Sequence, residues 1–194
     1  MNLYIRLFWA MVTARFRARV FVLEELVTNH LVWPNDIDLL GHVNNGRYFT
    51  MTDNVRIGWL IRAGIWKVMK QRGLYPVMGG ETAQFRKPLL PFRRFQIRSR
   101  TLGWDRRFFY VEHIFVSKEG VHAILLVKVI IVGEKKERVT PAEVIGFAHD
   151  TPVEEINVNE IIKNWNSSTD TQWADSKKYR AKVESGIRPH ADMS

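Results

Sequence analysis

The sequence predicts an α+β domain in which an antiparallel sheet curls around one long apolar helix. From residue 48 to about residue 70, apolar side chains recur at helical spacing. After Pro76 the pattern changes to a period of two residues, and four strand-like segments follow one another. A sheet wrapped around the helix is the simplest architecture that buries Trp59, Trp66 and these strands together.

Length and composition favour one folded domain with an extension at each end. The 194 residues are 46% hydrophobic, which is enough to bury one core. We expect a basic amphipathic segment at residues 1–19 and the sheet-and-helix domain at residues 20–140. A helical extension with a polar tail is expected at residues 141–194.

Residues 1–19 differ in composition from the rest of the chain. No acidic residue occurs before Glu24, whereas four arginines are interleaved with aliphatic and aromatic side chains. The apolar run at residues 7–14 is too short to span a bilayer. An amphipathic helix in the membrane interface, with its arginines at lipid phosphates, fits this pattern. The alternative is a helix that packs on the domain or on a partner subunit.

The domain begins with a β-rich segment at residues 20–33, which Pro34 ends. A loop leads into the long helix, which Arg72-Gly73 closes with a basic last turn and a glycine stop. The final strand-like segment has almost no polar alternation, as expected when both faces of a strand are covered. The four later strands are expected at residues 77–87, 92–104, 107–117 and 121–132.

Two helices are expected after the sheet. Thr140 is a suitable N-cap, Pro141 suits the first helical position, and Glu143 completes a capping box. A further helix is predicted at residues 153–165. Beyond Asn166 the chain is polar, and we expect an ordered extension there at most.

The composition excludes several kinds of site. Cysteine is absent, so disulfides, thiolate metal sites and a cysteine nucleophile are excluded. The six histidines are scattered without the spacing of metal ligands, so we expect no metal site. The net charge of +9 favours nucleic acid, a membrane surface or a phosphate-bearing ligand as partner. A solvated basic surface would give the same count.

The most informative segment lies between the first strand and the helix. It reads Asp38-x-x-Gly41-His42-Val43-Asn44-Asn45-x-x-Tyr48, and Asp53-x-x-Arg56 follows. With the downstream segment Ala83-Gln84-Phe85-Arg86-Lys87-Pro88-Leu89, it resembles the signature of the hotdog-fold acyl-CoA thioesterases, in their 4-hydroxybenzoyl-CoA thioesterase-like branch. The resemblance covers residues 26–133. It implies a hotdog fold, here with extra N- and C-terminal helices, although Asp53 replaces the usual glutamate.

The resemblance implies hydrolysis of the thioester bond of an acyl-CoA with a fatty or aromatic acyl group. Thioester hydrolysis needs an activated water or a carboxylate nucleophile, together with stabilisation of the oxyanion. Asp38 would be the general base or the nucleophile. The backbone N–H of Asn45, at the positive end of the helix, would bind the carbonyl oxygen. Gly41 and Gly46 would permit the sharp turns and the close approach of substrate.

Several of these residues also have plainer interpretations. Asp38 could be a loop or cap residue, because aspartate is common at turns, and we interpret Asp36 as a turn residue. A hydrogen bond within the loop is the favoured interpretation of His42. Asn44 is expected to brace the turn, and Tyr48 is expected to pack the helix.

Binding of substrate is expected to involve basic strand ends and a facing subunit. Arginine and lysine side chains near the second and third strands are candidates for the phosphates of coenzyme A, and ordinary basic strand ends are the alternative. Thr82, next to Glu81, lies where a facing subunit could complete the pocket. The expected substrate contacts are His42, Tyr48, Thr82, Arg86, Lys87, Arg93 and Arg94.

The expected partners follow from the same resemblance. Hotdog domains pair across sheet edges, so we expect a homodimer or homotetramer that binds acyl-CoA. No cofactor is expected beyond coenzyme A as part of the substrate, and no nucleic acid. A cytoplasmic location is expected, with peripheral membrane contact through residues 1–19. The competing function is a non-catalytic module that binds acyl-CoA or an acyl carrier.

Overall fold

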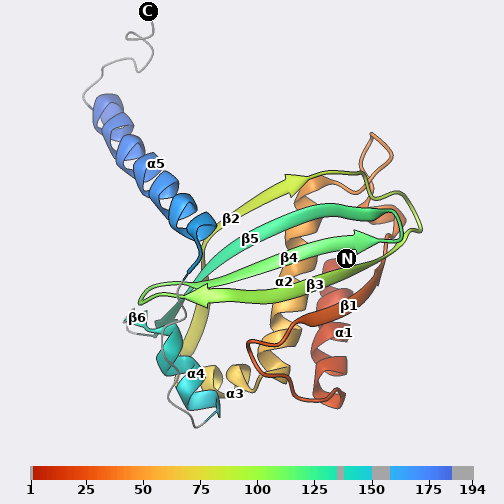
Figure 1. Ribbon diagram of the computed structural model, residues 1–194, viewed down its shortest axis with the longest axis horizontal. Coiled ribbons are helices and arrows are strands. Elements are labelled where there is room, and N and C mark those ends of the chain that lie inside the picture. Colours follow the sequence, from red (N-terminus) through yellow and green to blue (C-terminus); the bar gives the residue numbers. More distant parts are fainter. Residues whose placement is uncertain (1, 135–137, 150–157, 185–194) are drawn as a thin grey trace, which may run out of the picture. The chain divides into compact units, whose positions relative to one another are not determined.

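A computed structural model describes residues 2–134, 138–149 and 158–184. These residues form two compact units, divided between residues 157 and 158, and each unit is described by itself. The first unit contains the sheet and most of the helices, and the second contains α5 (Figure 1). Along the chain the elements are α1 (Asn2–Phe16), β1 (Leu26–Leu31), η1 (Pro34–Asp36), α2 (Asn45–Arg62), α3 (Ile65–Gln71), β2 (Leu74–Phe85), β3 (Arg94–Trp104), β4 (Phe109–Ser117), β5 (Gly120–Gly133), β6 (Arg138–Val139), α4 (Pro141–His149) and α5 (Glu160–Glu184).

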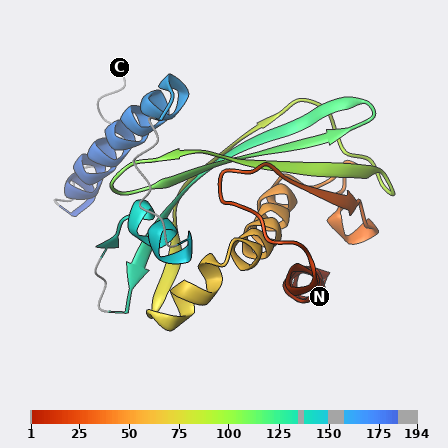
Figure 2. The same ribbon diagram turned by 60° about the horizontal axis from the view of Figure 1, so that its bottom comes forward.

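The sheet is antiparallel throughout and has the strand order β1-β3-β4-β5-β2, with β6 paired to β5. It curves over one side of α2, while α1 lies beside α2 near the β1 edge (Figures 1 and 2). The predicted α+β fold, an antiparallel sheet around a central helix, is therefore confirmed. β1 and β2 are the two edge strands of this order.

The core lies between α2 and the concave face of the sheet. α2 buries Tyr48, Met51, Val55 and Trp59, which recur every three or four residues and so share one face of the helix. Alternate residues of the central strands meet them, as expected for strands whose side chains point to opposite faces in turn. The sheet contributes Phe95, Ile97, Val111, Phe115 and Leu125 to this core.

The predicted single helix at residues 48–70 is two helices. α2 ends at the C-cap Ala63, and the next residue, Gly64, has a φ of 77°. Glycine adopts this left-handed conformation without a Cβ clash, and it commonly terminates helices. α3 then starts in a new direction, which places Trp59 in the core and leaves Trp66 half-buried.

Strand boundaries also differ from those expected. β1 spans Leu26–Leu31 and is shorter than the predicted segment at residues 20–33. β2 starts at Leu74, so Pro76 lies within the strand and does not precede it. Proline is tolerated here because β2 is an edge strand, whose outward amide positions need no partner.

The capping box predicted at the start of α4 is present. The Thr140 backbone N–H donates to the Glu143 carboxylate at 2.8 Å, and the Glu143 N–H donates to the Thr140 hydroxyl at 3.3 Å. These bonds satisfy two otherwise unpaired groups at the helix N-terminus.

The C-terminal extension is more helical than expected. Of the helix predicted at residues 153–165, residues 153–157 lie outside the described residues. α5 continues to Glu184, well beyond Asn166, where we expected only an ordered extension. Its sequence contains no glycine or proline, and the absence of these helix breakers was the overlooked signal.

Residues 2–16 form the predicted N-terminal helix, α1, which packs against α2. Within the described residues, no helix combines the length and the hydropathy needed to cross a bilayer.

Candidate functional site

The motif loop is closed on itself by backbone hydrogen bonds. Ile37 and Val43 form an isolated antiparallel bridge, and the Asp38 N–H donates to the His42 carbonyl at 3.0 Å. The Gly41 N–H donates to the Asp38 carbonyl at 3.1 Å, and Gly41 has a φ of 78°. A residue with a Cβ would be strained at that φ, so glycine is favoured in this turn.

The loop also fixes the Asp38 side chain, which is 23% exposed. Its Oδ1 accepts the Leu40 N–H at 2.9 Å, and its Oδ2 lies 3.8 Å from His42 Nδ1. His42 Nδ1 is also 3.2 Å from the Val43 carbonyl oxygen, which agrees with the favoured interpretation of His42 as a hydrogen-bonding residue of the loop. The carboxylate is therefore held in place yet remains accessible to solvent.

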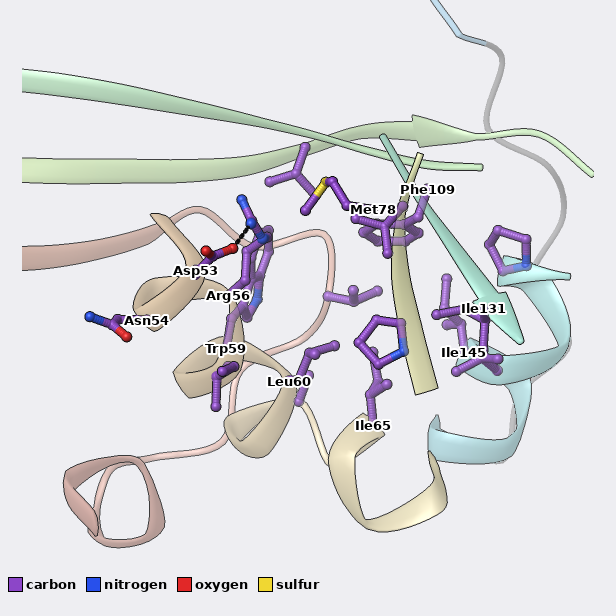
Figure 3. Close-up of a pocket in the computed structure, with 18 of the residues that line it drawn as sticks. Asp53, Asn54, Arg56, Trp59, Leu60, Ile65, Met78, Phe109, Ile131 and Ile145 are labelled. Carbon is purple, nitrogen blue, oxygen red and sulfur yellow. Dashed lines mark hydrogen bonds and ion pairs between the residues drawn. The ribbon is translucent and has the colours of Figure 1, made fainter. Parts of the chain in front are cut away.

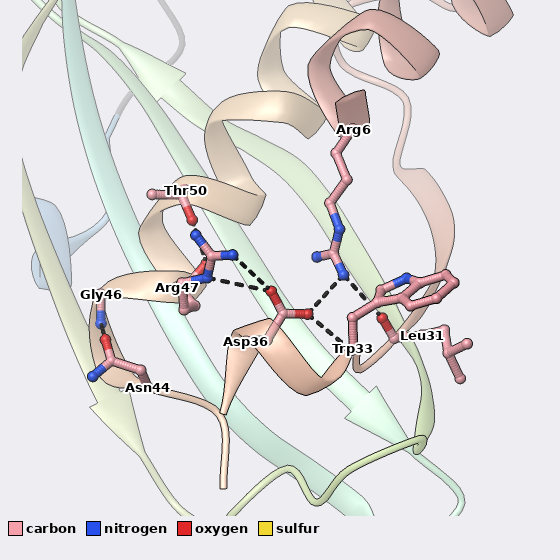
Figure 4. Close-up of polar contacts among 8 residues, drawn as sticks. All are labelled: Arg6, Leu31, Trp33, Asp36, Asn44, Gly46, Arg47 and Thr50. Carbon is pink, nitrogen blue, oxygen red and sulfur yellow. Dashed lines mark hydrogen bonds and ion pairs between the residues drawn. The ribbon is translucent and has the colours of Figure 1, made fainter. Parts of the chain in front are cut away.

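The start of α2 follows the loop directly. Asn44 braces the turn as expected, because its Oδ1 accepts the Gly46 N–H at 2.9 Å (Figure 4). The Arg47 N–H donates to the Asn44 carbonyl. The Asn45 N–H has no hydrogen-bond partner among the described residues, and it points from the positive end of the helix.

Gly46 takes part in the cap of α2. Its N–H is occupied by Asn44, and a Cβ at this position would lie 3.2 Å from Asn44 Oδ1. The side chain that approaches Gly46 closely is thus one of its own loop, and the close approach of substrate stays a prediction.

Asp36 is a turn residue as expected, at the end of the 3-10 helix η1, but it is also a buried member of an ion-pair cluster that was not predicted. The side chain is only 1% exposed and lies between two arginines, with Oδ2 2.6 Å from Arg6 and Oδ1 3.2 Å from Arg47 (Figure 4). The Trp33 N–H donates to the same carboxylate at 3.0 Å. Arg6, an isolated charge in an apolar helix, was the sequence signal for this cluster.

Tyr48 lies in the core, as its packing interpretation predicted. Its ring makes edge contacts with Phe85 and Phe115, and burial raises the pKa of its hydroxyl to about 12. Tyr48 was also a candidate substrate contact, but the structure places it beneath the motif and away from solvent.

The basic residues of the predicted substrate contacts gather at the end of the sheet near the motif loop. The Val43 N–H donates to the Leu89 carbonyl at 2.9 Å, which joins that loop to the connection between β2 and β3. Lys87 and Arg93 flank this connection, and both contact Glu119, at 2.7 Å and 2.8 Å. Arg86 and Arg94 are exposed nearby in sequence, whereas Thr82 is half-buried further along β2.

An apolar cavity of about 480 Å³ lies along the second half of α2 (Figure 3). All the residues that line it belong to one copy of the chain. The motif residues Asp38 and Asn45 do not line it. Its walls come from α2, α3, β2, β4, β5 and α4, and include Trp59, Leu60, Ile65, Met78, Phe109, Ile131 and Ile145.

A charged cluster lies at one end of the cavity. Arg56 contacts Asp53, and its guanidinium also lies 3.2 Å from Glu81 and 3.1 Å from the Thr52 hydroxyl. The Arg56 side chain is only 11% exposed, whereas that of Asp53 is 54% exposed. Burial is also the main cause of the raised pKa of Glu81.

A buried polar pair in the sheet was not predicted from the sequence. Ser99 Oγ is 2.7 Å from His113 Nδ1, and both residues are fully buried. Burial lowers the pKa of His113 well below its usual value, so this histidine is neutral. Among the described residues, no group of three or more His, Asp or Glu side chains is arranged to hold a metal ion.

Comparison with known proteins identifies the family. Residues 32–148 match the model of the thioesterase-like superfamily. Protein THEM6 of Xenopus laevis is 31% identical over 172 residues, which span 86% of this chain and 78% of that protein.

Solved structures share the fold. The probable thioesterase YbaW from Escherichia coli has a TM-score of 0.60 at 17% identity, covering 66% of this chain and 99% of that one. The gentisyl-coenzyme A thioesterase BH1999 has a TM-score of 0.56 at 21% identity, covering 62% of this chain and 98% of that one. The chain therefore belongs to the thioesterase-like superfamily and has the hotdog fold.

Proposed function

We propose that this protein hydrolyses acyl-CoA thioesters, with Asp38 and the Asn45 N–H acting on the same thioester. The observation that supports this proposal best is the backbone hydrogen bonding between residues 36–38 and residues 42–44 of the motif loop. Asp38 pairs with His42, and Asp36 pairs with Asn44 through the Asn44 N–H. Asn45 follows Asn44 directly, so this one closed loop carries both the fixed carboxylate of Asp38 and the unpaired amide at the start of α2. A thioester bound at the loop would meet both groups.

The chemistry follows from these two groups. As a general base, Asp38 would take a proton from the water that attacks the carbonyl carbon; as a nucleophile, it would attack that carbon itself. In either route the carbonyl oxygen becomes negative and accepts the Asn45 N–H, assisted by the helix dipole. The thiolate of coenzyme A then leaves and is protonated. In the general-base route the carboxylic acid is formed directly, whereas in the nucleophilic route water must still hydrolyse the mixed anhydride on Asp38 to release the acid.

The protein offers basic side chains for the phosphates of an acyl-CoA and an apolar cavity for its acyl group. The cationic side chains of Arg86 and Arg94 are exposed beside the connection that contacts the motif loop, where they can bind phosphates. The cavity along α2 is lined mainly by apolar side chains and can take a fatty or aromatic acyl group. One relative in fold, BH1999, is named for a coenzyme A thioester of an aromatic acid.

The site needs a second copy of the chain to exclude water. Leu39 and Leu40, in the turn after Asp38, are almost entirely exposed, which is unusual for two adjacent leucines. The unpaired edge of β2 also carries exposed apolar side chains, including Tyr75 and Val77. We propose a homodimer formed through this edge, because unpaired edges favour pairing with another chain.

The test is a thiol-release assay with acyl-CoAs from short to long chain and with benzoyl-CoA. We expect turnover of at least one class, and a loss of at least a hundredfold in Asp38→Ala, on the scale of a general base. The matched control is Glu25→Gln, which alters an exposed carboxylate paired with Arg98; Glu25 lies before β1, whereas the motif loop follows it. Unchanged turnover in Asp38→Ala would remove Asp38 from the mechanism.

A non-catalytic acyl-CoA-binding module is the second candidate. Asp38 lines neither the cavity beside α2 nor the groove between α1 and β1, and one of its carboxylate oxygens already accepts the Leu40 N–H. Micromolar binding of acyl-CoA without release of thiol by the wild type would favour this function.

A further inference from the structure

Helix α1 keeps its largest aromatic side chains outside. The side that faces the domain carries Arg6, Leu7, Ala10 and Ala14, while the large aromatic side chains face solvent. A helix that serves only to cover a core would bury its large apolar residues and expose its charges. The packing of α1 on α2 therefore does not explain its aromatic residues.

The helix is nevertheless firmly attached. Arg6 donates to the buried Asp36 at 2.6 Å and to the Leu31 carbonyl at 3.3 Å. Near the middle of the interface, Gly58 of α2 faces the Ala10 carbonyl of α1, and a Cβ built on Gly58 would contact that oxygen at an ordinary van der Waals distance of 3.9 Å. These contacts fix which side of α1 faces outward.

The outward side is broadly aromatic. Tyr4, Phe8, Trp9 and Phe16 are 75%, 64%, 60% and 86% exposed. At 100° per residue, these four positions fall within an arc of about 140° on one side of the helix. Such a set of exposed aromatic residues marks an interaction surface in a folded protein.

The charge beside this aromatic face is positive. Arg15, Arg17 and Arg19 are exposed, and none of them has an ion-pair partner among the described residues. No acidic residue occurs before Glu24. An apolar face bordered by arginines complements a surface that is apolar inside and anionic outside.

We propose that the aromatic face of α1, defined by Tyr4, Phe8, Trp9 and Phe16, docks on an anionic phospholipid surface. The aromatic rings would enter the interface at the level of the headgroups, and the three arginines would bind lipid phosphates. α1 would lie along the membrane and hold the hotdog domain at its surface.

A second copy of the chain is a poorer occupant for this face. α1 lies on the β1 side of the first unit, whereas the edge proposed to pair two copies is β2, at the other end of the strand order (Figures 1 and 2). A dimer through β2 leaves α1 uncovered. No clustered negative charge is available on α1 itself to attract the arginines of another copy.

The test is sedimentation of the full-length protein with phosphatidylcholine vesicles that contain or lack 30% phosphatidylserine. We expect binding to the anionic vesicles only, with affinity that falls steeply at high salt. Phe8→Ser/Phe16→Ser should weaken binding at least tenfold, because it removes two rings that would enter the membrane interface. Both side chains are mostly exposed, so the protein should stay folded. Arg15→Gln/Arg17→Gln should weaken it about 25-fold, at about fivefold per arginine.

Two controls separate membrane contact from a folding defect. Trp173→Ser removes an equally exposed tryptophan from α5 and should bind like wild type. Phe8→Leu/Phe16→Leu keeps the face apolar and should retain most of the binding. Absence of wild-type binding to anionic vesicles would overturn the proposal. A lower molar mass of Phe8→Ser/Phe16→Ser than of the wild type, measured without vesicles, would also overturn it. Such a result would show that a second copy of the chain covers this face.

Discussion

At the scale of single residues, the geometry of the motif depends on a few positions with no freedom to vary. Asp38 is oriented by the Leu40 N–H, and the Asn45 N–H is left unpaired because Asn44 caps Gly46 instead. The sequence predicted this motif and the bracing role of Asn44. It could not predict which amide Asn44 would occupy, since either neighbour is within reach of a short side chain.

Gly41→Ala tests the turn that orients Asp38. The left-handed φ of Gly41 costs any residue with a Cβ about 1 kcal/mol, although no atom lies within 4 Å of the added methyl group. We expect a loss of about 1 kcal/mol in the free energy of urea unfolding and a clear loss of turnover. Gly58→Ala, at a helical glycine with space for a Cβ, is the control and should not destabilise the protein.

His30 makes stability depend on pH. Burial lowers its pKa from 6.5 to about 4, with a smaller contribution from Arg6. Between these values the unfolded chain binds more protons than the folded one, so the free energy of unfolding falls as the pH is lowered. Between pH 7 and pH 5 the free energy of unfolding should fall in both proteins. We expect the fall to be about 1–2 kcal/mol smaller in His30→Gln than in the wild type.

Urea unfolding of both proteins at the two pH values measures this difference. Burial also lowers the pKa of His113 and His149, so the free energy of unfolding of the variant should still depend on pH, although less steeply. An identical loss in wild type and variant would show that His30 does not carry the effect.

At the scale of elements, α1 is joined to the motif by a buried ion-pair cluster. Asp36 sits directly before the motif loop and contacts both Arg6 of α1 and Arg47 of α2. Periodicity predicted both helices but not their junction, because a long-range ion pair leaves no repeating pattern in sequence. The break at Gly64 was equally hidden, since the apolar spacing continues on both sides of it.

Arg6→Ala should destabilise the protein by about 3 kcal/mol, because it leaves part of a buried carboxylate without a partner. Chemical denaturation measures the loss. Arg98→Ala is the matched control: its ion pair with Glu25 is exposed, so the cost should stay below about 1 kcal/mol. Similar effects of the two substitutions would contradict the structural importance assigned to Asp36.

At the scale of the whole molecule, the β2 edge is expected to join two copies. Val77→Lys places a charge on this edge and should convert the dimer to a monomer, with at least a tenfold loss of turnover. Val121→Lys is the control, at a similarly exposed valine of β5. Light scattering gives the molar mass, and an unchanged dimer in Val77→Lys would place the interface elsewhere.

The central claim is that Asp38 performs chemistry on a bound acyl-CoA. The most direct measurement is turnover of the preferred acyl-CoA by Asp38→Asn, alongside its affinity for a non-hydrolysable thioether analogue. We predict a turnover at least a hundredfold below that of the wild type, with a Kd within threefold of the wild-type value. Equal turnover, or a parallel loss of affinity that accounts for the whole effect, would contradict the claim.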